Sequence, residues 1–493
     1  MPAQLRILFV VAETWPLVKT GGLADVVPAL ARALIDAGHD VRLLLPGYRE
    51  VAEAFAGKPA GRAFEVLPGL PHARLVRGRL PGYDIPTWLL HCAPLYDRPG
   101  GPYTDEDGRD WEDNALRFGL LGKVGAMFGT ARGLDGWRAD VLHGHDWHAG
   151  LLPAYARLDP AVRAATVFTI HNLAYQGNFP ADTAGVLGLP AAALQPDGLE
   201  FYGQLSFMKA GLWYADWLST VSPTYARQIV TEAYGQGMSG VLQARADALT
   251  GILNGVDELA WNPAVDELLP ARYSSADLAG KARCKLELQD RFGLVRGPDR
   301  PLIGMVGRMP AQKGWDLLPE AVEALAPRQV QWALLGSGER ELEASLAKLS
   351  AAHPGSVGLY LGYDEALSHV LIAGADVFAM PSRFEPSGLT QMYSQLYGTV
   401  PVVRRTGGLA DSVVQATAAS VQDGSGTGFL FDEASGPALA QALDDAVSMY
   451  RDDRAGWARL QANGMRHEFG WRRPAAGYAE VYREALARRR GRN

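Results

Sequence analysis

The fold is decided by residues 6–46, which read RILFVVAETWPLVKTGGLADVVPALARALIDAGHDVRLLLP. Residues 6–12 form a short apolar run that predicts a buried strand, and residues 41–45 predict a second strand. Between them, apolar residues recur at helical spacing over residues 23–34, and Gly38 is placed to end that helix. The order strand, glycine-rich loop, helix, strand is typical of a parallel sheet covered by helices. We therefore predict an α/β fold.

The same alternation continues along the chain and restarts after Pro301. Apolar periodicity fails around residues 254–270, where Gly255, Pro263 and Pro270 mark a linker. The further strands that we predict lie at residues 140–142, 165–170, 217–221, 302–306, 331–335, 358–361, 376–380 and 400–403. We expect a first domain over residues 1–255, a second over 256–473 and a final helical segment over 474–493.

Composition excludes several classes of protein. Of 493 residues, 48% are hydrophobic and 20% are charged, which is enough apolar material for large cores and excludes a disordered chain. The net charge of −7 lacks the basic excess of a nucleic-acid binder. Cys92 and Cys284 are the only cysteines, so neither a disulfide framework nor a paired thiol metal site is expected. No apolar run approaches the about 18 residues of a membrane span. We expect a cytoplasmic protein that binds neither nucleic acid nor membrane.

One heptapeptide occurs almost twice. Residues 19–25 read KTGGLAD and residues 405–411 read RTGGLAD, each after a predicted strand and before a predicted helix. Backbone N–H groups at the start of a helix attract anions. In the first copy, Lys19 and the glycine pair form either a phosphate cradle or an ordinary turn with a solvated lysine.

Two other loops carry charge. Residues 307–314 (GRMPAQKG) place Arg308 and Lys313 on one strand-to-helix loop, which suits a diphosphate but is also compatible with two surface cations. Residues 382–390 (SRFEPSGLT) combine hydroxyls with Glu385, which is suited to accept hydrogen bonds from sugar hydroxyls. We expect a helix to open at Gly388, with Ser387 as its N-cap on the purely structural interpretation.

Histidines follow two of the predicted strands. Residues 143–148 (HGHDWH) resemble a metal site, but no second ligand cluster with comparable spacing occurs in the sequence. We therefore favour a polar ligand-binding loop at the carboxyl end of a parallel strand. Residues 169–177 (TIHNLAYQG) put His171 and Asn172 at a similar place, although a lone histidine is more often structural. The dinucleotide, P-loop and esterase motifs are absent or incomplete.

Together with ILNGVD at residues 252–257, these motifs in this order resemble the bacterial glycogen synthases, which are related to plant starch synthases, over about residues 5–485. The resemblance implies a retaining glycosyltransferase of family 5 with two Rossmann-like domains facing across a cleft, the GT-B architecture. It implies transfer of glucose from ADP-glucose to the non-reducing end of an α-1,4-glucan such as glycogen, with no cofactor or metal. It leaves the oligomeric state open.

The resemblance also implies roles for individual residues. Catalytic roles fall to Arg308, Lys313, Glu385 and His171. Contacts with ADP-glucose fall to Lys19, Gly21, Gly22, Asp25, Tyr96, Asp146, Asn172, Tyr363, Ser387, Gly388, Leu389, Thr390, Gly407 and Gly408. The last helix, at about residues 474–488, is expected to cross back onto the first domain.

The chain departs from the family pattern at two positions. Ser387 stands where many bacterial members have cysteine, and Tyr393 stands where the wider glycosyltransferase group has a second glutamate. Without a second carboxylate, we favour front-face substitution over a covalent intermediate. Two alternatives are a sugar-nucleotide epimerase on the same scaffold and a non-catalytic protein that binds a nucleotide sugar or glucan.

Overall fold

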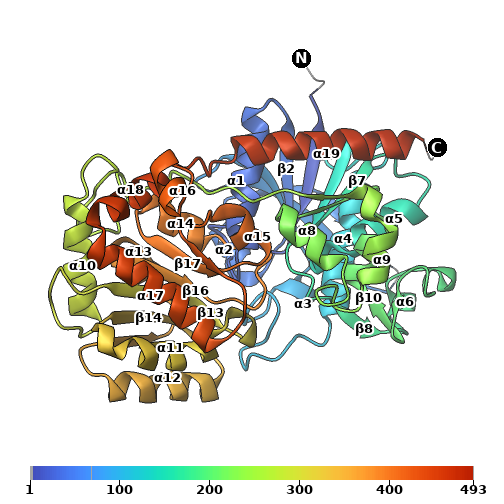
Figure 1. The fold of residues 1–493 in the computed structure, drawn as a ribbon. Helices are drawn as coiled ribbons and strands as arrows, with labels where there is room; N and C mark the ends of the chain where they lie inside the picture. Colours follow the sequence, from blue (N-terminus) through green and yellow to red (C-terminus); the bar gives the residue numbers. More distant parts are fainter. Residues whose placement is uncertain (1–3, 68, 492–493) are drawn as a thin grey trace. The chain divides into compact units, whose positions relative to one another are not determined.

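A computed structural model describes residues 4–67 and 69–491 (Figure 1). The chain divides into two compact units. The first unit comprises the chain up to Gly255 together with the chain from Trp471 onward, and the second unit is Val256–Gly470. Both units are built on largely parallel sheets with helices on their faces, which confirms the α/β prediction.

The first unit has a nine-stranded sheet whose central strand comes first in the chain. In order across the sheet the strands are β12 (Leu249–Gly251), β11 (Trp217–Thr220), β7 (Ala165–Ile170), β6 (Val141–His145), β1 (Arg6–Val10), β2 (Asp40–Pro46), β5 (Ile85–His91), β4 (Ala73–Leu80) and β3 (Lys58–Phe64). Pairing is parallel from β12 to β5. Because β1 lies between β2 and β6, the sheet grows outward from β1 in both directions, as in Rossmann folds.

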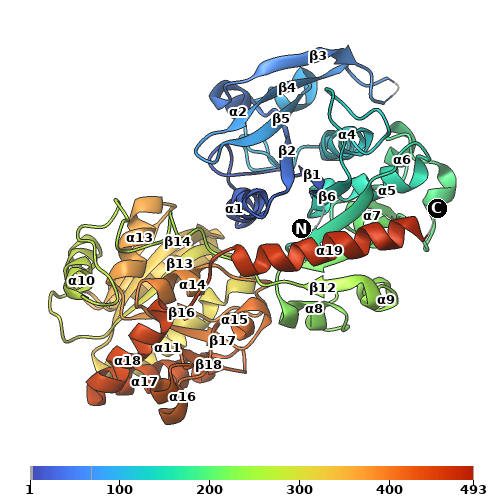
Figure 2. The same cartoon turned by 90° about the horizontal axis from the view of Figure 1, so that it is seen from above.

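Helices cover both faces of this sheet. α1 packs beside α19, and α4 packs beside α5; Figure 2 shows the two pairs on opposite faces. α19, red in the figures, contacts β7 and β11 and so returns the end of the chain to the first unit. The helices of this unit are α1 (Leu23–Asp36), α2 (Arg49–Ala54), α3 (Ala93–Tyr96), α4 (Asn114–Met127), α5 (Leu151–Leu158), α6 (Thr183–Val186), α7 (Phe207–Tyr214), α8 (Pro223–Ile229), α9 (Ser239–Ala244) and α19 (Arg472–Arg490).

Two parts of the first unit were not predicted. β4 pairs antiparallel with both β5 and β3, so one edge of the sheet is an antiparallel extension. A small separate sheet has the order β8 (Asn178–Pro180), β10 (Gln204–Ser206) and β9 (Glu200–Phe201). β3 is largely exposed and its sequence is interrupted by Lys58, Gly61 and Arg62, so it lacks the apolar run by which the buried strands were recognised.

The second unit has a six-stranded parallel sheet, which also grows outward in both directions from its first strand. Its order is β15 (Val357–Leu361), β14 (Gln331–Gly338), β13 (Leu302–Met309), β16 (Val377–Met380), β17 (Val400–Arg404) and β18 (Phe429–Phe431). The first strand of the unit, β13, again lies at the point where the order reverses. The helices are α10 (Ala279–Arg291), α11 (Leu318–Leu325), α12 (Arg340–Ala352), α13 (Glu365–Gly374), α14 (Thr390–Leu396), α15 (Gly407–Ser412), α16 (Ala418–Asp423), α17 (Gly436–Asp452) and α18 (Arg454–Met465).

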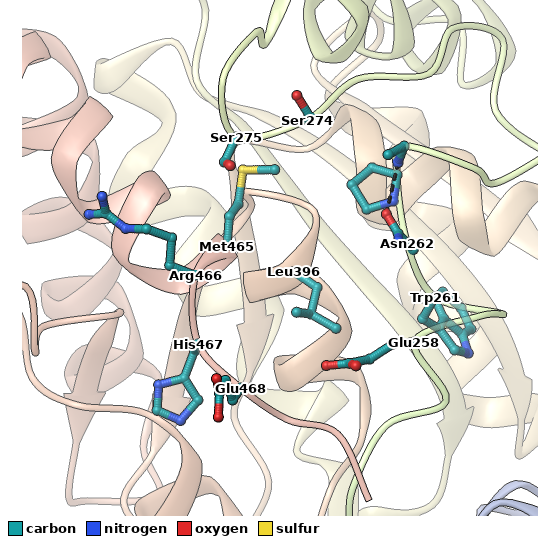
Figure 3. Close-up of a pocket in the computed structure, with 12 residues that line it drawn as sticks. Glu258, Trp261, Asn262, Ser274, Ser275, Leu396, Met465, Arg466, His467 and Glu468 are labelled. Atoms are coloured by element: carbon teal, nitrogen blue, oxygen red, sulfur yellow. Dashed lines mark hydrogen bonds between the residues drawn. The ribbon is translucent and has the colours of Figure 1, made fainter. Parts of the chain in front are cut away.

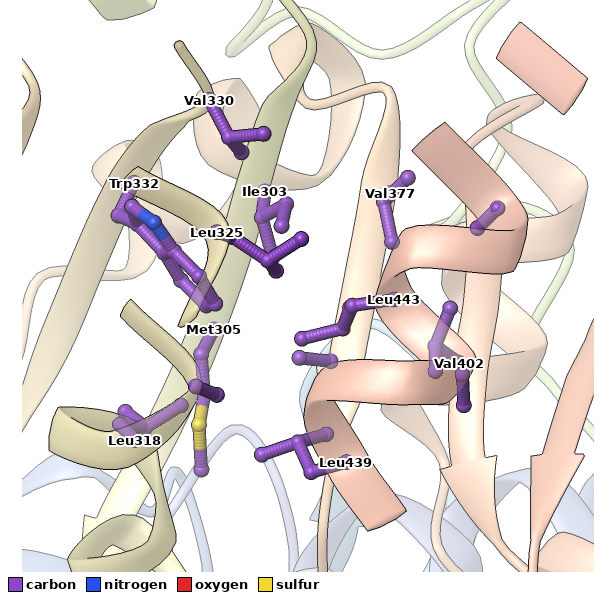
Figure 4. Packing of buried hydrophobic residues seen from close by; sticks show 14 of the residues in the cluster. Ile303, Met305, Leu318, Leu325, Val330, Trp332, Val377, Val402, Leu439 and Leu443 are labelled. Carbon is purple, nitrogen blue, oxygen red and sulfur yellow. The ribbon is translucent and has the colours of Figure 1, made fainter. Parts of the chain in front are cut away.

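Alternate residues of these strands enter two separate apolar cores. Ile303 and Met305 of β13 join Trp332 in a core shared with α11 and α17 (Figure 4). Leu302 and the neighbouring Ala333 point the other way, into a core shared with α10, α13 and α14. Since successive side chains of a strand face opposite sides, a strand that is buried on both faces is a continuous apolar run. This is why the central strands were recognisable in the sequence.

A stack of three aromatic rings packs the segment at the start of the second unit against two of its helices. The Trp261 ring lies flat between His369 of α13 and Tyr393 of α14, with ring centroids 3.8 and 3.9 Å apart. His369 Nδ1 lies 2.7 Å from the buried Asp266 carboxylate. Burial disfavours the charged imidazolium, but hydrogen bonds to Asp266 and Glu365 outweigh it and raise the pKa of His369. The protonated ring therefore stabilises the folded unit.

We predict that His369→Asn removes a pH-dependent part of the stability. A raised pKa in the folded state contributes stability that is full below the unfolded value, about 6.5, and is lost as pH rises through the folded value. The free-energy difference between wild type and variant in urea unfolding should therefore shrink as pH rises from about 6 to about 8, by about 1.4 kcal/mol for each unit of pKa shift. His72→Asn, at an exposed position, is the matched control. A difference that does not change with pH would contradict the prediction.

Candidate functional site

The candidate residues of the first unit follow its two central strands. β1 ends at Val10 and β6 ends at His145. Because the connections from neighbouring strands at a reversal point leave toward opposite faces, a crevice opens outside their carboxyl ends. The loop that carries Lys19 and the loop that carries Asp146 both begin at this edge of the sheet.

Glu13 organises the loop after β1, and the sequence analysis did not select it. Its side chain is buried, and its carboxylate accepts the N–H groups of Thr20 and Gly21, the latter at 3.3 Å. Burial raises the pKa of Glu13 to about 7. The available signal was an acidic residue placed directly after a buried strand and shortly before a glycine pair.

The first heptapeptide is held by its own side chains. Lys19 Nζ lies 3.1 Å from Asp25 Oδ1, and Gly22 is the N-cap of α1. A Cβ built on Gly21 would approach Glu13 no closer than 3.9 Å. Since the Gly21 N–H donates to Glu13, the cation and the start of α1, rather than this N–H, are what the loop offers to an anion.

Asp146 is held in an unusual backbone conformation at the end of β6. Its φ and ψ are 59° and 179°, a region that residues with a side chain rarely adopt and that is found at functional sites. Its N–H donates to Thr169 O at 2.9 Å, and its carboxylate lies 3.5 Å from the Asn172 N–H. Burial, together with the nearby Glu13 carboxylate, raises the pKa of Asp146 to about 7. Asp146 and Glu13 are therefore two buried carboxyl groups at the same edge of the sheet.

The three histidines near Asp146 do not converge on one point. His143 uses both ring nitrogens, toward Tyr482 of α19 at 3.0 Å and toward Thr169 at 2.6 Å. His145 Nδ1 lies 3.0 Å from His171 Nε2, while the His148 ring stacks on Tyr103. Among the described residues, no group of three or more histidine, cysteine or acidic side chains is arranged to hold a metal ion.

His171 and Asn172 follow β7, next to Asp146. Both residues are partly exposed. The largely buried position of the His171 ring lowers the pKa of His171 to about 3. Asn172 Oδ1 accepts the N–H of Ala174 at 3.1 Å, which fixes the turn. Tyr96, by contrast, is buried, and its hydroxyl donates to Arg117 O at 2.6 Å. Tyr96 thus forms part of the interior, whereas His171 and Asn172 reach the surface.

The candidate residues of the second unit gather at the carboxyl ends of β13 and β16. Arg308 is exposed near the end of β13. Lys313 Nζ lies 2.6 Å from Glu385 Oε2, and the Ser382 hydroxyl donates to the same oxygen at 3.0 Å. Gln312 binds the loop after β16 through Phe384 O at 3.0 Å. The structure therefore brings Lys313 together with Glu385, which the sequence analysis placed on a different loop.

The helix after this loop begins later than predicted. α14 starts at Thr390 with Leu389 as its N-cap, and Gly388 has a φ of 64° and lies outside the helix. The expectation that Ser387 caps a helix opening at Gly388 is therefore wrong, because the left-handed glycine extends the loop by two residues. The Ser387 hydroxyl is buried and has no hydrogen-bond partner among the described residues.

The second heptapeptide differs from the first in the use of its glycines. A Cβ on Gly407, which has a φ of 45°, would lie 1.9 Å from Glu385 O, and one on Gly408 would lie 2.1 Å from Ser387 O. The Gly408 N–H donates to Glu385 O at 3.0 Å. These glycines let α15 pack directly against the loop that carries Glu385. Their role is therefore to hold that loop by close backbone packing.

Two further surface features of the second unit are an exposed tyrosine and a hollow. Tyr363 is 70% exposed, and its hydroxyl donates to the Glu365 carboxylate. A hollow of about 340 Å³ is lined by residues that include Glu258, Arg466 and Glu468 (Figure 3). None of the sequence-predicted site residues lines it, and its two carboxylates make it a poor site for a phosphate.

Comparison with known proteins gives the same architecture. Residues 6–244 match the starch synthase catalytic domain, and residues 287–459 match glycosyl transferases group 1. The glycogen synthase of Nitrosospira multiformis is 46% identical over 99% of this chain and 100% of its own length. That of Thioalkalivibrio sulfidiphilus is 49% identical over 98% of this chain and 100% of its own length.

Solved structures are similar over nearly the whole chain. The catalytic domain of Arabidopsis thaliana starch synthase IV, bound to ADP and acarbose, has a TM-score of 0.87 and 31% identity, covering 98% of this chain and 100% of that one. A sucrose-phosphate synthase from Thermosynechococcus elongatus, with a TM-score of 0.58 and 20% identity, covers 98% of this chain and 100% of that one and shares the fold. No described helix has the length and apolar character needed to cross a membrane.

We predict that Glu13→Ala loosens the loop after β1. The Thr20 and Gly21 amides lose their acceptor, so at a pH above the Glu13 pKa of about 7 their hydrogen exchange should become at least about tenfold faster, since a hydrogen bond to a charged group contributes about 1.5–3 kcal/mol. Mass spectrometry of peptides covering residues 13–25 measures this. Glu106→Ala, at an exposed position, should leave these peptides unchanged. Equal exchange in wild type and Glu13→Ala would show that Glu13 does not hold the loop.

Proposed function

We infer, since this chain belongs to the glycogen synthases, a family of GT-B retaining glucosyltransferases, that it transfers glucose from ADP-glucose to the non-reducing end of an α-1,4-glucan. Identity of 46–49% over almost the whole of both chains carries the family assignment. The two alternatives, an epimerase and a non-catalytic binding protein, have no comparable support.

The ion pair of Lys313 and Glu385, with Arg308 near the end of β13, is the observation that carries the chemistry. Lys313 pairs with the Glu385 carboxylate at the reversal point of the sheet in the second unit, where such sheets bind ligands, and Arg308 is exposed near the end of β13. We propose that Arg308 and Lys313 bind the diphosphate of ADP-glucose and that Glu385 accepts hydrogen bonds from sugar hydroxyls. Lys313, 2.6 Å from Glu385, links the two functions.

In the step that we propose, the bond between the glucose anomeric carbon and the β-phosphate oxygen breaks on the same face on which the acceptor 4-hydroxyl attacks. The leaving phosphate takes the hydroxyl proton, and Arg308 and Lys313 stabilise the negative charge that develops on it. This route needs no carboxylate nucleophile. It agrees with Tyr393, which packs on Trp261 where the wider group has a glutamate.

We propose that the first unit binds the same donor through Lys19, Asp25, Asp146, His171 and Asn172. The start of α1, with Lys19 beside it, suits the phosphate end of the donor, while His171 and Asn172 suit neutral sugar hydroxyls. In the second unit, Tyr363 offers an exposed ring for the adenine. We place the protein in the cytoplasm, because Cys92 and Cys284 are both buried free thiols.

We predict that Arg308→Ala and Lys313→Ala each lower kcat by about 10²–10³-fold, which is typical for the loss of one group that stabilises transition-state charge. Unfolding midpoints should stay close to that of the wild type for Arg308→Ala, because Arg308 is exposed. The exposed Arg340→Ala and Lys348→Ala serve as matched controls. Near-normal turnover in both site variants would exclude the proposed mechanism.

The function itself is tested by label transfer. Protein incubated with radiolabelled ADP-glucose or UDP-glucose, with and without glycogen, should move label into precipitable glucan only when glycogen is present, and faster from ADP-glucose. An epimerase would change the labelled sugar without glycogen, and a binding protein would retain the donor unchanged. Either of those outcomes would refute glucan synthesis.

A further inference from the structure

Three histidines form a row that runs from the interior of the first unit to its candidate site. His143 and His145 lie two residues apart on β6 and so share a face of the strand, with ring centroids 4.0 Å apart. His145 Nδ1 then meets His171 Nε2 at 3.0 Å. Only His171 of the three reaches the surface. What the buried rings do to His171 therefore bears on the site.

All three rings are neutral at physiological pH. Burial holds the pKa values of His143 and His145 well below their usual range and lowers that of His171 to about 3. A neutral imidazole has one N–H donor and one lone-pair acceptor. In the contact between His145 and His171, one ring must therefore donate and the other must accept.

The surroundings of His145 decide which ring donates. Its Nε2 is buried and has no hydrogen-bond partner among the described residues. If His171 donated, the proton of His145 would lie on this Nε2 as a buried, unpaired N–H group. If His145 donates, Nε2 keeps only a lone pair. Unpaired buried N–H groups are rarer than under-satisfied acceptors, so the second arrangement is favoured.

We propose that His145 is a positioning residue that donates its Nδ1–H to His171 Nε2 and thereby fixes the His171 proton on Nδ1, as a donor directed to an oxygen of the bound sugar nucleotide. The partner of His171 rests on the proposed function, but the tautomer does not. An imidazole fixed in this way has its lone pair occupied, so it cannot act as the base for the acceptor hydroxyl. That leaves the proton to the departing phosphate.

His145 is in turn held by the interior. The adjacent His143 is fixed at both nitrogens, by Tyr482 Oη at 3.0 Å and Thr169 Oγ1 at 2.6 Å, and Thr169 Oγ1 lies 2.6 Å from Ser219 Oγ. Phe9 packs against both rings. His145 thus has little freedom to rotate away from His171.

The tautomer is tested without substrate. In protein labelled with ¹⁵N-histidine, long-range proton–nitrogen correlation spectra of the ten imidazoles distinguish protonated from unprotonated ring nitrogens. The signals of His171 are those lost in His171→Gln. We expect a protonated Nδ1 and an unprotonated Nε2. The reverse pattern overturns the proposal, whether or not the protein transfers glucose.

Two substitutions test the consequence for catalysis. His145→Asn places an amide donor near the position of Nδ1, and His145→Leu fills similar space without a donor. We expect His145→Leu to lower kcat about tenfold or more with the KM for ADP-glucose within about twofold, equivalent to loss of one positioning hydrogen bond. His145→Asn should recover most of that loss.

The control is His39→Leu. It removes a buried histidine that has no contact with these rings and whose Nδ1 accepts the Leu5 N–H at 3.3 Å. It should keep its turnover per folded molecule. Equal losses in the Asn and Leu variants of His145, or full activity in His145→Leu, overturn the proposal. If His145→Leu does not fold, the wild-type spectrum still decides the tautomer. If wild type transfers no glucose, the proposed function fails while the spectrum still tests His145.

Discussion

Both units depend on one constraint, the reversal of strand order at their first strand. Growth of a parallel sheet in both directions from β1, and again from β13, forces the loops after neighbouring strands to separate. Each separation exposes backbone and side chains at the carboxyl edge that would otherwise be covered by a helix. Lys19, Asp146 and Glu385 lie in segments that leave the sheet at these edges, and Arg308 lies near the end of β13.

The same constraint explains how much the sequence predicted. Buried strands such as β7 and β13 are apolar on both faces, so their positions were clear, and the polar residues directly after them were natural candidates. β3 was missed because its residues are mostly exposed, and Ser387 was misassigned because a left-handed Gly388 delays the start of α14. Local pattern reveals a strand and its end, but not how the loop beyond it turns.

Contacts across the sheet lay beyond the reach of the sequence. Glu13 looked like the end of an apolar run, and only the structure shows its carboxylate beneath the Thr20 and Gly21 amides. His145 ends β6 and His171 directly follows the neighbouring β7, so their contact depends on the register of β6 with β7. The two similar heptapeptides illustrate the same limit, since one is held by a glutamate and the other is packed against a loop through its glycines.

The return of α19 to the first unit has a consequence for synthesis of the chain on the ribosome. The Tyr482 hydroxyl that binds His143 lies 339 residues further along the chain. At about 5–20 residues per second, translation separates the two by roughly 20–70 s. During that interval the whole of the second unit is synthesised, while β7 and β11 lack the helix that packs on them. The unit that begins the chain is thus the last to be completed, and a nascent-chain chaperone has an apolar surface to protect until then.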